Sequence, residues 1–248
     1  MYKNPLYYLF LIAFSLGACV TQKQHVADAD ITYLRANDDV EGSDKDIETL
    51  VASYRNQVEE EMNTEIGYMP ETLKKGKPNS NMGNWFCDAL LDLSNQYYDK
   101  EVDFALQNYG GLRIPTIPKG NLTKNTIFEL MPFDNKLVII NVKGDIVQMI
   151  CDNMADSNGA PVSHTVSFRI EDDKAVDIKI KGEALDLSKT YIVGLPDYVA
   201  NGGGGSTFLR GIQQFDTGIF IREGVIQYLE QLKERGEPIT INNTKRIY

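Results

Sequence analysis

The stretch Asp103-Phe104-Ala105-Leu106-Gln107-Asn108-Tyr109-Gly110-Gly111-Leu112-Arg113 predicts a strand that runs directly into a glycine turn. Phe104 and Leu106 have the two-residue spacing of a strand. The paired glycines permit backbone angles that other residues avoid, and they let a ligand approach the main chain. Asn108 offers an amide on one side of the turn, and Arg113 offers a planar cation suited to phosphate or carboxylate on the other.

A second glycine turn, Asn201-Gly202-Gly203-Gly204-Gly205-Ser206, follows another predicted strand at residues 191–195. Two units in which a strand leads into a glycine loop suggest a ligand cleft lined by backbone. The alternative is a pair of tight turns beside a solvated arginine, because short glycine motifs also occur without any ligand.

The composition is that of an ordinary globular protein, with 248 residues, 42% hydrophobic and 24% charged. Acidic residues outnumber basic ones by 35 to 25, which gives a net charge of −10. A nucleic-acid-binding surface usually shows a basic excess, so this balance disfavours a nucleic-acid partner. A small anionic ligand stays possible, because local groups decide such binding.

The N-terminus resembles that of an exported bacterial lipoprotein. Lys3 precedes an apolar run, residues 6–18, that is too short to favour a membrane span. The run closes on Leu16-Gly17-Ala18-Cys19, which resembles a lipobox. We therefore expect a signal peptide at 1–18, lipid attachment at Cys19, a polar tether at 19–43 and a folded domain at 44–248. Val20 is not the inner-membrane retention aspartate, so the outer membrane, facing the periplasm or the cell surface, is the expected location. A plain signal peptide with an incidental cysteine is the alternative.

Periodicity predicts a single α/β domain, with a mixed or antiparallel sheet flanked by helices. Helical spacing covers residues 46–62, a segment from 81, 125–130, 145–154 and 220–235, and strands are predicted at 137–142, 166–170, 176–180, 191–195 and, at an edge, 238–241. The apolar run 137–142 indicates a strand buried on both faces. Cys87 and Cys151 are interpreted as small buried hydrophobes, with a disulfide left open. Asp88, beside an apolar helix face, is interpreted as a partnered structural group, with a functional role as the alternative.

Four motifs in order resemble the 5′-nucleotidase C-terminal domain family. They are Asn81-Met82-Gly83-Asn84 with Asp88-Ala89, Asn108-Tyr109-Gly110-Gly111-Leu112-Arg113, Gly120 with Pro132-Phe133-Asp134-Asn135, and Asp197-Tyr198-Val199-Ala200-Asn201-Gly202-Gly203. The resemblance covers roughly residues 46–235, and each motif is weak while the four in this order are specific.

This resemblance implies a site for the nucleoside part of a nucleotide, with the base held between two aromatic rings. The implied substrate-binding residues are Asn108, Gly110, Gly111, Arg113, Phe133, Asn201, Gly202, Gly203 and Phe208. Asn108 would hydrogen-bond the base, Arg113 would reach the ribose and phosphate, and Phe133 would stack on the base.

The chain departs from the family pattern at three positions. Ser206 stands where a second aromatic is expected, Gly204 replaces an aspartate, and Pro78 aligns with a family arginine. Phe208 and Lys77 are the neighbouring substitutes.

The metal-dependent half of the family's chemistry has no counterpart in the motifs of this chain. The family hydrolyses phosphate esters at a two-metal site in a separate domain, and such a site needs several Asp, His and Asn ligands. The two histidines here, His25 and His164, are in no metal-ligand pattern. We therefore assign this chain no catalytic residue, metal or cofactor.

The leading hypothesis is the nucleotide-binding subunit of a split 5′-nucleotidase, with divalent metals held by a separate metallophosphatase chain. The alternatives are a lipoprotein that captures nucleosides or nucleotides without chemistry, and an interaction domain whose cleft has decayed.

Overall fold

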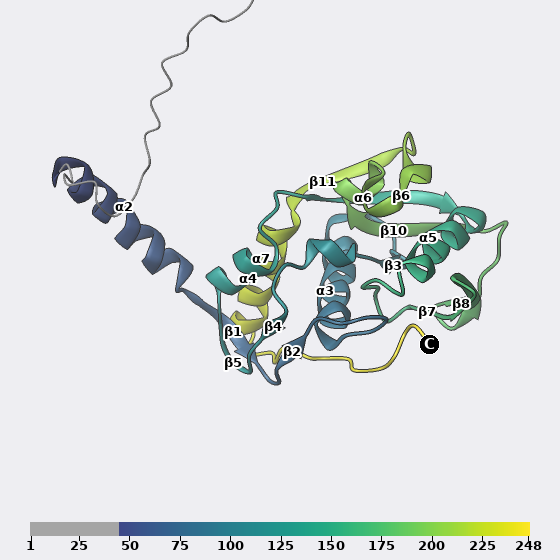
Figure 1. Ribbon diagram of the computed structural model, residues 1–248, viewed down its shortest axis with the longest axis horizontal. Helices are drawn as coiled ribbons and strands as arrows, with labels where there is room; N and C mark the ends of the chain where they lie inside the picture. Colours follow the sequence, from purple (N-terminus) through teal and green to yellow (C-terminus); the bar gives the residue numbers. More distant parts are fainter. Residues whose placement is uncertain (1–44) are drawn as a thin grey trace, which may run out of the picture. The chain divides into compact units, whose positions relative to one another are not determined.

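The computed structural model describes residues 45–248 (Figure 1). Residues 49–248 form one compact unit, and residues 1–48 are assigned to another. The predicted signal peptide, the predicted lipid-attachment site Cys19 and the predicted tether lie outside the described residues. Within residues 45–248, no helix is long and apolar enough to cross a membrane.

Helices and strands are interspersed along the chain, which gives the predicted mixed α/β architecture. The helices are α2 (Lys45–Met62), α3 (Asn81–Tyr97), α4 (Lys124–Leu130), α5 (Gly144–Asp156), α6 (Asp197–Ala200) and α7 (Ile221–Glu234). The strands are β1 (Glu65–Met69), β2 (Leu73–Lys74), β3 (Phe104–Ala105), β4 (Thr116–Ile117), β5 (Gly120–Thr123), β6 (Lys136–Lys143), β7 (Val166–Glu171), β8 (Lys174–Ile180), β9 (Glu183–Ala184), β10 (Thr190–Pro196) and β11 (Gln214–Phe220).

The central sheet has the strand order β11-β6-β10-β3. Strand β6 pairs antiparallel with β10 and β11, whereas β10 pairs parallel with β3. The sheet is therefore mixed, as predicted. Strands β7, β8 and β9 form a separate antiparallel sheet, and β1-β5 and β2-β4 form two short ribbons.

Strand β6 separates two hydrophobic cores. Leu137 and Ile139 belong to the first core, which α3, α4 and α7 also build. Val138, Ile140 and Val142 point the other way, into a second core with α5, β7 and β8. Because successive side chains of a strand face opposite sides, a strand between two cores is apolar at nearly every position. The prediction of a strand buried on both faces is confirmed.

Helix α3 begins where the sequence predicted, and its cap explains the start. Ser80 is the N-cap residue, and its hydroxyl accepts a hydrogen bond from the Gly83 backbone N–H at 3.0 Å. A capping hydroxyl satisfies one of the unpaired donors at a helix start. Cys87 in this helix and Cys151 in α5 are both buried free thiols. The disulfide between them, which the sequence left undecided, does not form.

The predicted edge strand at residues 238–241 is wrong. This part of the chain has no regular structure, and Ile239 packs into the first core. The segment that follows α7 instead runs past α3 to β7, where the C-terminus lies (Figure 1). The Asn84 side chain donates to the carbonyls of Asn242 at 2.9 Å and Thr244 at 3.1 Å. The Asn84 amide therefore satisfies two backbone carbonyls of the C-terminal segment, which has no neighbouring strand there to pair with them.

Candidate functional site

A buried glutamine, Gln107, supports the first glycine turn through a hydrogen bond to its backbone. After β3 the chain passes through Gln107, which is fully buried, and its Oε1 accepts the Asn108 backbone N–H at 2.9 Å. A 3₁₀ turn covers Tyr109–Gly111. A Cβ on Gly111 would lie 2.9 Å from Asn108 Oδ1 and from the Gln107 side chain, too close for any real side chain.

The reason for glycine in this turn therefore differs from the predicted one. Neither Gly110 nor Gly111 has a positive φ. Gly111 is required by the close approach of two side chains, and not by an unusual backbone angle. Its lack of a Cβ lets Asn108 and Gln107 lie against the turn.

An aromatic ring, that of Tyr198, packs against the backbone of the second glycine turn. Gly202, Gly204 and Gly205 have φ values of +96°, +61° and +85°, in the left-handed region that favours glycine. A Cβ on Gly203 would lie 2.4 Å from the ring of Tyr198, so that ring packs directly against the main chain. The Asn153 side chain from α5 donates to the Gly204 carbonyl at 3.0 Å and fixes the turn.

The first glycine turn borders a pocket of about 280 Å³. Its lining residues are Asn108, Gly110, Gly111, Arg113, Phe133, Asn135 and Tyr198. We call it the stacking pocket. Phe133 and Tyr198 are 41% and 50% exposed, and both rings border this pocket. The Arg113 guanidinium lies 5.6 Å from the centre of the Phe133 ring.

Asn108 presents a buried acceptor in the wall of this pocket. Its Oδ1 is buried and accepts no hydrogen bond from the residues that the structure describes. A buried polar atom without a partner is costly, and at a ligand site such an atom is commonly satisfied by the ligand or by water. The Asn108 carboxamide therefore suits a ligand with a hydrogen-bond donor at its edge.

Two lysine ammonium groups lie over the Tyr109 ring beside the pocket. Lys75 Nζ and Lys77 Nζ lie 4.0 Å and 4.7 Å from the centre of the Tyr109 ring. Partial burial lowers the pKa of Lys75, and repulsion by Arg113 and Lys77 lowers it further. An anion bound nearby would relieve this repulsion. Lys77 thus brings a positive charge close to Pro78, the position of the missing family arginine.

The structure brings together most of the residues that the sequence predicted for the site. Asn108, Gly110, Gly111, Arg113 and Phe133 line the stacking pocket. Asn201, Gly202 and Gly203 line a neighbouring shallow pocket, which also includes Tyr198 and Arg210.

Phe208 lies elsewhere, and the sequence reasoning missed Tyr198. Phe208 is half-buried against the second core and is not among the residues that line either of these pockets. Tyr198 shares the stacking pocket with Phe133 instead. Its signal is present in the motif Asp197-Tyr198-Val199-Ala200, but the family pattern predicted the second aromatic only after the glycines.

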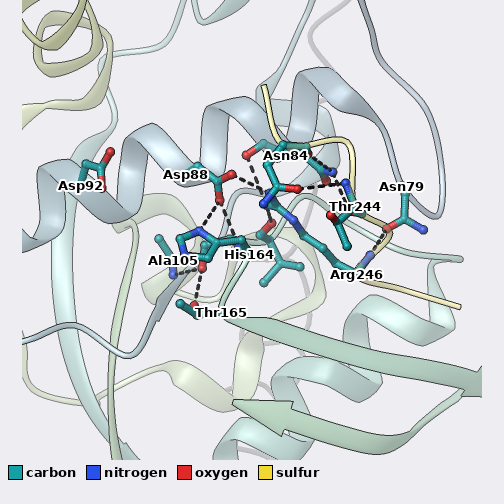
Figure 2. Close-up of polar contacts among 12 residues, drawn as sticks. Asn79, Asn84, Asp88, Asp92, Ala105, His164, Thr165, Thr244 and Arg246 are labelled. Atoms are coloured by element: carbon teal, nitrogen blue, oxygen red, sulfur yellow. Dashed lines mark hydrogen bonds and ion pairs between the residues drawn. The ribbon is translucent and has the colours of Figure 1, made fainter. Parts of the chain in front are cut away.

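A separate polar cluster lies on α3 and surrounds Asp88 (Figure 2). Asp88 Oδ1 accepts from the His164 backbone N–H at 2.8 Å and lies 3.1 Å from His164 Nδ1. Asp88 Oδ2 accepts from Arg246 Nη2 at 2.6 Å. Arg246 is 2% exposed and also donates to the carbonyls of Asn84 and Val162. Asp88 is therefore a partnered structural group that ties α3 to two distant parts of the chain.

The described cysteines are buried, and the described acidic and histidine side chains form no metal-ligand cluster. Residues 45–248 contain no group of three or more His, Cys, Asp or Glu side chains that could hold a metal ion. Burial raises the pKa of the Cys151 thiol to about 12, and burial also raises that of Cys87. Both thiols are therefore protonated at neutral pH and packed as small hydrophobes.

Comparison with known sequences points to one family. The sequence pattern of the family described as "5′-nucleotidase, C-terminal domain" matches residues 62–211. Protein UshA of Escherichia coli is 28% identical over 166 residues, which cover 63% of this chain and 29% of that protein. A 5′-nucleotidase of Vibrio vulnificus is 25% identical over 193 residues, 76% of this chain and 34% of that protein. The chain thus spans about a third or less of the length of these relatives.

Comparison with solved structures agrees with this family match. The crystal structure of a 5′-nucleotidase precursor from Thermus thermophilus superposes with a TM-score of 0.68 at 28% identity. The superposition covers 82% of this chain and 43% of that one.

Proposed function

Because this chain belongs to the 5′-nucleotidase C-terminal domain family, we propose that it binds the nucleoside end of a nucleotide in the stacking pocket. The observation that carries the proposal is the convergence of Phe133, Tyr198, Asn108 and Arg113 on one pocket from three separate motifs. Phe133 and Tyr198 supply two exposed rings for a planar base, and stacking on an aromatic ring contributes roughly 1–3 kcal/mol per base.

The polar groups of the pocket suit the remaining parts of a nucleotide. The buried Asn108 Oδ1 accepts a hydrogen bond from a base nitrogen. The Arg113 guanidinium, beside the Phe133 ring, serves the ribose and phosphate. Lys75 and Lys77 add positive potential around Tyr109, which favours the anionic end of the ligand.

We further propose that phosphate-ester hydrolysis requires a separate metallophosphatase chain. The described side chains of residues 45–248 offer no donor set for a metal, so the two-metal chemistry of the family does not fit them. The partner would dock on the face that carries Asn108, Arg113 and Phe133, where the phosphate would emerge. Export and lipid anchoring through Cys19 belong to the same proposal, because an anchored subunit would act in the cell envelope.

Calorimetric titration of the full chain with adenosine, AMP and a pyrimidine nucleotide tests the binding. We expect metal-independent binding that weakens at least about fivefold in Phe133→Ala and in Tyr198→Ala. The matched control is Phe215→Ala, since Phe215 is 47% exposed but does not line the stacking pocket. Absence of heat and of thermal stabilisation with every ligand would support the decayed cleft instead.

Capture from envelope extracts tests the partner. A metal-dependent AMP hydrolase that co-purifies with the wild-type chain, and whose activity drops when Arg113→Ala is used, is the expected result. Nucleotide binding that persists without any such activity would favour the scavenging alternative.

A further inference from the structure

Helix α2 carries an apolar face that stays exposed within the described residues. Leu50, Val51, Tyr54 and Val58 are between 44% and 63% exposed, and no residue of this 18-residue helix is buried within residues 45–248. Helices in proteins owe most of their stability to packing of an amphipathic face, so this face needs a partner. The match to the family pattern begins at Met62, the last residue of α2, and therefore assigns no role to the helix.

The apolar side chains of α2 have the spacing of a coiled-coil seam. Val51, Tyr54 and Val58 are separated by steps of three and four residues, and Ile47 continues this spacing toward the N-terminus. Such alternating steps place side chains along one line of contact between two helices. Val51 and Val58 occupy the a positions of the heptad and Tyr54 occupies the d position, and β-branched residues at a positions favour pairs of helices.

The seam ends before the last turn of α2. Glu61 takes the d position after Val58, and a carboxylate between two helices would be unfavourable. Its Oε1 lies 2.5 Å from Lys124 Nζ, so Glu61 pairs with α4 of its own chain instead. The surface available to a partner helix is therefore the part of α2 up to Val58.

The charges of α2 disfavour a lipid surface as its partner. Acidic residues outnumber basic ones in this helix by five to two; they are Asp46, Glu48, Glu59, Glu60 and Glu61 against Lys45 and Arg55. Helices that lie in a membrane interface are instead rich in Lys and Arg, which anionic lipids attract. An acidic amphipathic helix is better covered by another protein helix.

The residues beside the seam permit pairing with a second copy of α2. In a parallel pair, Leu50 of one helix faces Arg55 of the other, and Gln57 faces Met62. Neither pair brings like charges together, and the methylene groups of an arginine can cover a leucine. The acidic residues 59–60 fall at b and c positions, which point away from the partner into water.

We propose that α2 pairs in parallel with α2 of a second copy of this chain. The parallel direction rests on the lipid anchor proposed above at Cys19, because two chains held in one membrane leaflet would enter α2 from the same end. A seam of a few side chains covers less surface than the roughly 1,200–2,000 Å² of a stable soluble interface. Confinement to one membrane raises the effective concentration of the two helices and offsets this deficit.

Disulfide crosslinking of the full chain in envelope membranes tests the pairing. Tyr54→Cys and Val58→Cys each place a thiol in the seam, where identical positions of two parallel helices meet. Asn56→Cys is the matched control, because Asn56 is also exposed on α2 but lies at an f position, opposite the seam. Each seam variant should yield at least about fivefold more disulfide-linked dimer than the control.

The native cysteines allow this measurement. Cys87 and Cys151 are buried free thiols, and burial keeps them protonated and out of reach of an oxidant. The wild-type chain, which also contains Cys19, measures the remaining background.

Two double variants separate a specific seam from chance collisions. Tyr54→Glu combined with Val58→Cys puts a carboxylate into the seam of both helices and should abolish the excess dimer. Asn56→Glu combined with Val58→Cys adds the same charge on the opposite face and should keep it. Glutamate is a good helix former, so both double variants should retain α2.

The outcomes distinguish this inference from the function proposed above. Equal crosslinking of all three single variants, or no excess dimer from either seam variant, overturns the pairing. Dimer from Tyr54→Cys without dimer from Val58→Cys overturns the parallel arrangement, because antiparallel helices bring identical positions together only where they cross. Recovery of the chain in the soluble fraction refutes the anchor, while the disulfide pattern still decides the pairing. Titration of the same variants with adenosine tests the stacking pocket independently.

Discussion

Removal of the Arg246 side chain should destabilise the fold more than any other single charge change near the C-terminus. Arg246 is 2% exposed, and its Nη2 donates to Asp88 Oδ2 at 2.6 Å. Its Nη1 donates to the Asn84 carbonyl at 3.2 Å and also to the carbonyl of Val162 (Figure 2). The guanidinium thus joins α3 to the segment before β7 through one buried group.

The expected loss follows from these contacts. Breaking a buried ion pair by removal of one partner costs about 3–5 kcal/mol, because the other charge is left without compensation. The Asp88 side chain is 23% exposed and keeps its hydrogen bond to the His164 backbone, so the lower end of that range applies. We expect Arg246→Ala to lower the free energy of unfolding by about 3 kcal/mol. For a unit of this size the melting temperature should fall by about 6–12 °C.

Urea denaturation followed by circular dichroism measures this loss. Arg235→Ala is the matched control, because Arg235 pairs with Glu237 at 3.0 Å on the exposed surface and should change stability little. Arg246→Met preserves much of the packing volume and isolates the charge, and the double variant with Asp88→Asn should recover part of the loss. An Arg246→Ala chain as stable as the Arg235→Ala chain would refute the reasoning.

Three further predictions concern the second glycine turn, the C-terminal segment and a carboxyl group of α3. Gly203→Ala should weaken adenosine binding at least about fivefold in a calorimetric titration, since its Cβ would lie 2.4 Å from the Tyr198 ring and displace it; unchanged affinity would exclude Tyr198 from the site. Asn84→Ala should lower the free energy of unfolding by about 2 kcal/mol in urea titrations, because two carbonyls of the C-terminal segment lose their donor. Loss of hydration raises the pKa of Asp92 above its ordinary 3.8, although its carboxylate accepts from the Tyr228 hydroxyl at 3.0 Å. The wild-type fold therefore loses stability as the pH rises from the ordinary pKa of an aspartate through the raised pKa of Asp92. Asp92→Asn should raise the melting temperature at pH 7 but not at about pH 3, where the wild-type carboxyl is protonated in both the folded and the unfolded chain. An equal rise at both pH values would contradict this sign.

Local patterns predicted the elements and most of the site. Alternation and apolar runs located β6, β7, β8 and β10, because side-chain direction repeats every two residues along a strand, whereas the central-sheet strand β11 was not predicted. The glycine turns and their flanking Asn108 and Arg113 were found from sequence, since turn chemistry is encoded within a few neighbouring residues. The family match over residues 62–211 agrees with the four motifs that suggested it.

The sequence-based predictions failed where the structure depends on contacts between residues far apart in the chain. Tyr198 and Phe133 are 65 positions apart in the sequence, yet both line one pocket. The predicted edge strand at 238–241 has no regular structure, and the segment that follows it is held by the side chain of Asn84 in α3, which donates to the carbonyls of Asn242 and Thr244.

The sequence by itself determined the fold class, the two glycine turns and the family, because each depends on short-range periodicity or on a few adjacent residues. Only the tertiary structure decided the partner of Asp88, which is Arg246, 158 positions further along the chain. It also decided the pocket between the two glycine turns and α5, whose lining comes from residues 77 to 209. Such contacts depend on how the elements pack against two cores, and no local pattern of side chains encodes that packing.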